Sequence, residues 1–108
     1  MHPARIAPAN PARIGRWEPF PSDQRRTLAD LLAHAIPEDP RYAAFAGAIS
    51  RVWWESKSYA WFMDATERSR PDAGGARNIT LGCPINGEII LDLRGDGRIE
   101  GAEFTSRL

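Results

Sequence analysis

A turn bracketed by glycines, Gly95-Asp96-Gly97, divides two runs of alternating apolar and polar residues near the end of this chain. Alternation with a period of two predicts strands with one buried face, and glycines around an aspartate favour a tight reversal between them. The segment from Asp92 to Phe104 is therefore predicted to be a β-hairpin. This hairpin constrains the fold strongly, because a slip of one residue would move every side chain to the opposite face of the sheet.

A three-residue loop gives the better register for this hairpin. It places Leu93 opposite Ile99, so that apolar faces coincide, and it puts Gly97 in the left-handed region that glycine adopts readily. The same register sets Asp92 opposite Glu100, a like-charge pair on the outward face of the sheet. Nearby arginines are expected to neutralise that face.

The same segment also has the spacing of a calcium-binding loop of the EF-hand type. Carboxylates stand at loop positions 1, 5, 9 and 12: Asp92, Asp96, Glu100 and Glu103. Arg94, however, stands at the third position, where a ligand is needed. The chain on either side also lacks the pattern or the length of the two flanking helices. Calcium binding through Asp92–Glu103 is thus an alternative function, and the favoured hairpin predicts no metal site.

Size and charge limit the classes of function. The 108 residues suffice for one hydrophobic core, and Lys+Arg and Asp+Glu are equal at 14 each, so no overall field attracts nucleic acid or an anionic membrane. No run approaches the roughly 20 apolar residues of a membrane span, and one cysteine excludes an internal disulfide. Because arginine replaces lysine almost everywhere and alanine is abundant, we expect a bacterial protein. The single cysteine and the lack of an apolar span predict a cytoplasmic location without a membrane partner, and the balanced charge makes a nucleic-acid partner unexpected.

Residues 1–21 are predicted to be an extended arm. They hold five of the nine prolines, which lack the amide hydrogen that helices and sheets require, and Pro3-Ala4-Arg5-Ile6 recurs as Pro11-Ala12-Arg13-Ile14. Apolar residues within the arm, among them Trp17 and Phe20, would fasten it across the domain surface. Residues 22–108 are predicted to form a single domain.

Two helices are predicted after the arm. Apolar residues recur at helical spacing from Leu28 to Ile36, which predicts a helix over residues 23–36 that ends before Pro37. A second helix is predicted to begin at Asp39, with Pro40 in its first turn. Residues 51–64 fit either a continuation of that helix or a hairpin. Their concentration of aromatic residues favours a hairpin, with strands at 52–55 and 59–63.

The remaining chain is typical of an antiparallel sheet. Residues 68–75 carry the proline and glycines of a loop, and strands are predicted at 77–81, 88–93 and 98–104. We therefore predict an α+β fold with two N-terminal helices packed on a small antiparallel β-sheet of four to five strands.

Residues 51–105 resemble a family of short bacterial proteins of unknown function. Members end in a pattern close to G-x-I-L-D-x-D-x-D-G-R-L-x-G-I-E-I, similar to the segment from Gly87 to Phe104, and Trp54–Phe62 is similar to their first strand, turn and strand. The chain departs from the pattern at Arg94, at Ser58 and in the two preceding helices. The resemblance implies a small antiparallel sheet and no established activity.

The sequence lacks the motifs of an enzyme: it has two histidines and one cysteine, without a metalloprotease, phosphate-loop or CxxC pattern. No catalytic residue and no cofactor is predicted. Four tryptophans exceed what a core of this size usually needs, and such rings dominate protein interfaces. The residues expected at a partner surface are two tryptophans and the outward carboxylates: Trp54, Trp61, Glu88, Asp92, Asp96, Glu100 and Glu103.

We therefore predict a non-enzymatic protein-binding module of a bacterial cytosol. Immunity proteins and antitoxins, which neutralise a toxin by binding it, are of this size class, and the acidic residues suggest a basic toxin as the partner. Self-association into a homodimer through an exposed sheet edge is a further alternative that would use the same aromatic residues.

Overall fold

The computed structural model describes residues 5–6, 14–72, 74–83 and 85–107. The elements, in chain order, are β1 (Trp17–Pro19), α1 (Ser22–Ala35), α2 (Arg41–Gly47), β2 (Arg51–Trp54), β3 (Tyr59–Trp61), α3 (Ala65–Ser69), β4 (Arg77–Cys83), β5 (Gly87–Leu93), β6 (Ile99–Phe104) and the 3₁₀ turn η1 (Thr105–Arg107).

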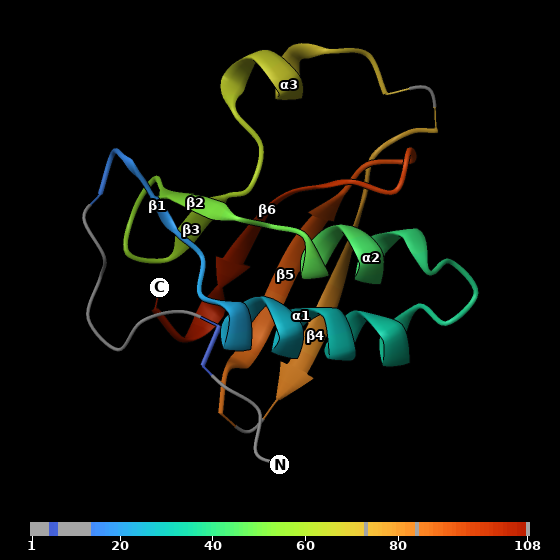
Figure 1. The fold of residues 1–108 in the computed structure, drawn as a ribbon, viewed down its shortest axis with the longest axis horizontal. Helices are drawn as coiled ribbons and strands as arrows, with labels where there is room; N and C mark the ends of the chain where they lie inside the picture. The colour runs from blue at the N-terminus through green and yellow to red at the C-terminus, as the bar shows by residue number, and fades with distance from the viewer. Residues whose placement is uncertain (1–4, 7–13, 73, 84, 108) are drawn as a thin grey trace.

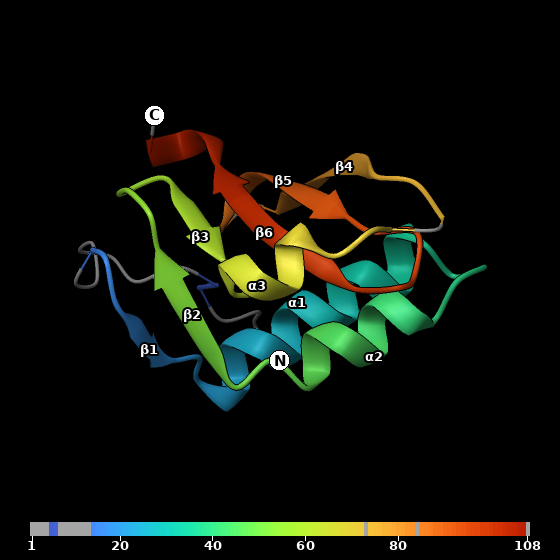
Figure 2. The same ribbon diagram turned by 90° about the horizontal axis from the view of Figure 1, so that it is seen from above.

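The strands form one antiparallel sheet in the order β1-β2-β3-β6-β5-β4. Helices α1 and α2 lie side by side against one face of the sheet, and α3 lies apart from them at one end (Figure 1). Seen at right angles, the helix pair and the sheet form two layers (Figure 2). The predicted α+β class is confirmed, and the predicted number of elements is corrected to three α-helices and six strands among the described residues.

The core lies between these two layers. Leu28 and Leu32 of α1 are completely buried, because their spacing of four places them on the same face of the helix. Opposite them, Leu91 of β5 and Ile99 of β6 are equally buried. Each fully buried aliphatic side chain contributes roughly 1.5–3 kcal/mol through removal of apolar surface from water.

The C-terminal hairpin has the predicted three-residue loop. Leu93 pairs with Ile99, the Arg94 amide donates to the Arg98 carbonyl at 2.8 Å, and Gly97 has φ of 90°. The predicted pairing of Asp92 with Glu100 is wrong. Asp92 lies opposite Gly101, because a β-bulge inserts Glu100 as an extra residue in β6.

The hairpin also removes the structural basis of the calcium alternative. Asp92 and Glu103 lie within strands β5 and β6, so the segment has no helix–loop–helix geometry. Within the described ranges, no group of three His, Cys, Asp or Glu side chains is placed to hold a metal ion.

Described residues that precede α1 pair with the sheet, and the rest of the predicted arm, residues 1–4 and 7–13, lies outside the described residues. Trp17–Pro19 pairs with β2, and the amides of Gly15 and Phe20 extend the ladder to the carbonyls of Trp54 and Ser50. Prolines were expected to prevent such pairing, but Pro19 is tolerated because β1 is an edge strand that needs partners on one side only. Ile6 is also buried in the core, with 1% of its surface exposed.

The aromatic segment after α2 is a hairpin, as predicted. β2 and β3 pair antiparallel, with Trp53 opposite Trp61, so the alternative of one long helix is wrong. The short helix α3 was not predicted. Among the described residues, no helix has the length and apolar character needed to cross a bilayer, and α1, with 14 residues, is the longest.

Candidate functional site

Three tryptophans stand in one row across the N-terminal half of the sheet. Trp17 of β1 lies directly opposite Trp53 of β2, which lies opposite Trp61 of β3. Because directly opposed residues share a face, all three point away from α1 and α2, whereas Trp54 points toward the helices. Each of the three is half-buried. We refer to Trp17, Trp53 and Trp61 as the tryptophan ladder.

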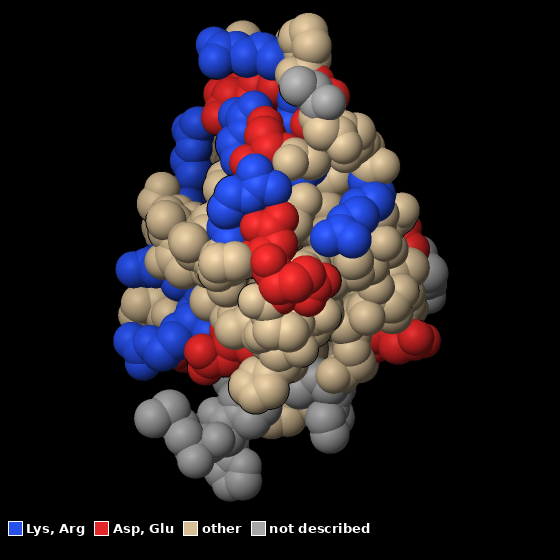
Figure 3. Space-filling model, turned by 90° about the vertical axis from the view of Figure 1, so that its right-hand side faces the viewer, with Lys and Arg blue, Asp and Glu red and all other residues tan. Residues whose placement is uncertain are grey.

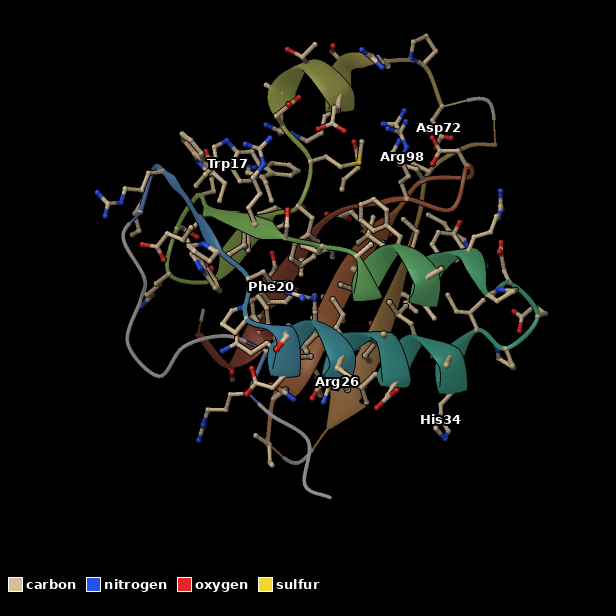
Figure 4. The ribbon with its side chains drawn as sticks, viewed as in Figure 1. Trp17, Phe20, Arg26, His34, Asp72 and Arg98 are labelled. Carbon is tan, nitrogen blue, oxygen red and sulfur yellow. The ribbon has the colours of Figure 1, made fainter. Side chains whose placement is uncertain are left out.

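The rings of the tryptophan ladder and its neighbours meet edge to face. Trp17 and Trp53 have centroids 5.6 Å apart, and Tyr59 meets Trp61 at 4.7 Å. Figure 4 shows Trp17 among side chains beside β2, on the side away from α1, whereas Phe20 lies next to the start of α1. A cavity of 160 Å³ opens between the ladder and α3, and its other lining residues are Met63, Asp64, Ala65 and Arg68.

Two arginines lie over rings of the ladder. The guanidinium of Arg51 lies 4.0 Å from the centroid of the Trp17 ring, and that of Arg68 lies 3.6 Å from the Trp61 ring. Arg51 also forms an ion pair with Asp64 at 3.8 Å. Among the described residues, Arg68 has no carboxylate within ion-pair distance, and its Nε is enclosed without a hydrogen-bond partner.

The helix α3 places Arg68 over the ladder. Asp64 caps it, because its Oδ1 accepts from the Glu67 amide at 2.7 Å while the Glu67 side chain accepts from the Asp64 amide. The hydrogen bond from the Glu67 backbone is also the main cause that lowers the pKa of Asp64. A helix of five residues is too short to be stable alone, so it depends on such contacts.

Arg94 fixes the chain that follows α3. Its side chain is 4% exposed, and its Nη atoms donate to the carbonyls of Arg68 at 3.4 Å and Arg70 at 2.7 Å. Its charge is balanced by Glu100 at 3.2 Å and Asp96 at 3.5 Å. Arg94 therefore neutralises Glu100, as expected of the nearby arginines, and does so from a buried position.

Tyr59 and Asp92 form a polar contact beside the ladder. The Tyr59 hydroxyl donates to Asp92 Oδ2, and Asn78 Nδ2 donates to Oδ1 of the same carboxylate at 3.3 Å. Burial, and then the hydrogen bond to Asp92, raise the pKa of Tyr59. Tyr59 thus stays protonated and acts as a hydrogen-bond donor, which is not the state of a general base.

The two tryptophans expected at a partner surface have different positions. Trp61 lies in the ladder, at the wall of the cavity. Trp54 is corrected to a core residue: it is 2% exposed and packs on Phe104 at a centroid distance of 5.5 Å. Its place in β2, next to outward-facing Trp53, explains the difference, since neighbours in a strand point to opposite faces.

The predicted acidic residues do not form one acidic surface. Asp96 is held by Arg98 at 2.8 Å, and Glu100 is held by Arg94. Figure 3 shows blue and red side chains alternating over the side of the molecule that faces the viewer. The other three, Glu88, Asp92 and Glu103, lie along β5 and β6, where Asp92 is bound to Tyr59. A basic partner stays a prediction.

Trp17, Trp53 and Arg68 were absent from the predicted site. Trp53 could have been found from the hairpin prediction, because an inward Val52 and Trp54 require an outward Trp53. Trp17 could not, since its segment was expected to lie outside the sheet. Arg68 depends on α3, for which the sequence gives only the Asp64-to-Glu67 capping pattern.

No family model, curated protein or solved structure matches this chain. The resemblance of residues 51–105 to short bacterial proteins stays a prediction, and the site must be interpreted from its own geometry.

Proposed function

We propose that this protein is a non-enzymatic protein-binding module that holds its partner on the tryptophan ladder. The observation that carries this proposal is the alignment of three half-buried tryptophans, directly opposed on adjacent strands, around one cavity. Large rings that are partly exposed and rigidly held are the residues that dominate binding energy at protein interfaces.

The size of the cavity favours a protein partner over a small-molecule substrate. Ligand pockets usually measure about 300–1,000 Å³, and the cavity beside the ladder measures 160 Å³. That volume suits one inserted side chain of a partner. Neutralisation of a toxin by direct binding, the role of immunity proteins and antitoxins of this size, would be served by such a surface.

A library of random peptides displayed on phage, panned against the full chain, tests this function. We expect enriched peptides whose binding is lost in Trp53→Ala and Trp61→Ala, both with an unchanged circular dichroism spectrum. Thr80→Ala, exposed on β4, is the matched control and should bind normally. Absence of enrichment, or binding that both tryptophan variants retain, would refute the proposal.

Self-association through β4 is a second candidate function. β4 is a sheet edge of seven residues without proline or lysine, whereas the opposite edge, β1, has three residues and ends at Pro19. Long edges without such blocking residues pair readily with another strand. Sedimentation analysis should then give a dimer that Thr80→Lys converts to a monomer, and a monomeric wild type at high concentration would exclude this candidate.

A further inference from the structure

Arg68 is a cation at the ladder whose counter-ion is missing from the described residues. Asp64, which also lines the cavity, pairs with Arg51 at 3.8 Å, and Glu55 Oε2 accepts from the indole nitrogen of Trp61 at 3.2 Å. In the part of the chain that the structure describes, the guanidinium of Arg68 contacts the Trp61 ring and no carboxylate. A partly enclosed cation without an anion is unfavourable unless a ligand supplies one.

The guanidinium of Arg68 is also held in place before any ligand binds. Its Cζ lies 3.6 Å from the centroid of the Trp61 ring, the helix that carries it is fixed by the capping box at Asp64, and the Arg68 carbonyl accepts from Arg94. Because these contacts already restrict the side chain, an anion that binds Arg68 costs little further conformational entropy.

We infer that the ladder recognises an acidic peptide segment, with an apolar side chain in the cavity and an adjacent Asp or Glu carboxylate on Arg68. Guanidinium and carboxylate form two parallel, charge-assisted hydrogen bonds, so the pair would also fix the direction of the peptide. A carboxylate suits the site better than a phosphate, since Asp64 lines the same cavity and would repel a doubly charged group more strongly. This inference rests on the proposed function of the ladder.

The experiment uses one peptide enriched on the full chain and its variant with each Glu or Asp changed to the amide. Titrations followed by tryptophan fluorescence should show that the amide peptide binds wild type about tenfold more weakly, the loss expected for a hydrogen bond to a charged group. Arg68→Gln should bind the acidic and amide peptides equally, and Arg68→Lys should restore part of the preference. Arg70→Gln, two residues along and exposed, is the matched control and should behave as wild type.

The outcomes separate the two proposals. Enriched peptides that are neutral or basic, yet lose binding in Trp61→Ala, would overturn the acidic preference and leave the protein-binding function standing. No enrichment at all would overturn both. Binding of a single-stranded oligothymidylate that depends on Trp61 and Arg68 and exceeds peptide binding would assign the surface to nucleic acid instead and overturn the inference.

Discussion

Arg94 carries its charge into the interior of the molecule, where it joins the hairpin to the chain after α3. Arg94→Met should destabilise the protein by about 3 kcal/mol, because it leaves the carbonyls of Arg68 and Arg70 without donors and Glu100 without its cation. Urea unfolding followed by tryptophan fluorescence measures the loss.

Arg98→Met is the matched control for Arg94. Arg98 also pairs with Asp96, but its side chain is 31% exposed, so its removal should cost less than about 1 kcal/mol. Equal losses in the two variants would show that burial of Arg94 adds nothing to the stability of this region.

Asp96 is expected to make stability depend on pH. The hydrogen bond from Arg98 is the main cause that lowers the pKa of Asp96 below its ordinary value of 3.8. Because the folded pKa lies below the unfolded one, the stabilising contribution is present above 3.8 and is lost as the pH falls through the folded pKa.

Asp96→Asn tests this dependence. The wild type should be more stable than the variant at neutral pH, and the gap should close in acid, since asparagine cannot lose a charge. Urea unfolding of both proteins across the acidic range measures the gap, and contributions of the other carboxylates cancel in the difference. A gap that is constant with pH would contradict the lowered pKa of Asp96.

At the scale of elements, the turn of the C-terminal hairpin requires a glycine at position 97. Gly97 has φ of 90°, and a Cβ added there would lie 2.7 Å from the Cβ of Arg41 in α2. Gly97→Ala should therefore cost more than the roughly 1–2 kcal/mol of a left-handed alanine. Gly75 has φ of 79° and open space around it, so the stability lost in Gly75→Ala measures the cost of the left-handed conformation alone. Thermal unfolding of both variants should rank Gly97→Ala lower, and equal melting temperatures would refute the contact with α2.

The elements differ in how far the sequence predicts them. The register of the hairpin at its turn was predictable. With Gly97 in the loop, the pairing that puts Leu93 and Ile99 on a common apolar face is the three-residue loop. The β-bulge at Glu100 was not, since alternation alone does not indicate an extra residue, and Arg94 beside it binds carbonyls more than 20 residues away in the sequence. The helix α3 escaped prediction because its five residues carry no apolar period.

At the scale of the whole molecule, balanced charge totals say nothing of where charges meet. Figure 3 shows acidic and basic side chains together on the face turned to the viewer. Equal totals of acidic and basic residues cannot predict that some arginines form ion pairs while others lie over tryptophan rings. That difference depends on β1 and α3, which bring Trp17 and Arg68 to the same cavity. The sequence therefore pointed to a tryptophan surface, but of the residues in the tryptophan ladder it named only Trp61.

The contribution of the N-terminal residues to stability shows where the domain begins. The repeated Pro-Ala-Arg-Ile sequence supplies a matched pair of variants that measures it. Ile6 is 1% exposed and its amide donates to Asn86 Oδ1 at 2.6 Å, whereas Ile14, in the second copy, is 56% exposed. Ile6→Ala should cost about 2–5 kcal/mol, the usual loss for a buried isoleucine, and Ile14→Ala should stay within about 0.5 kcal/mol of wild type. Urea unfolding measures both, and equal small effects would mean that the domain begins at β1 and not before it.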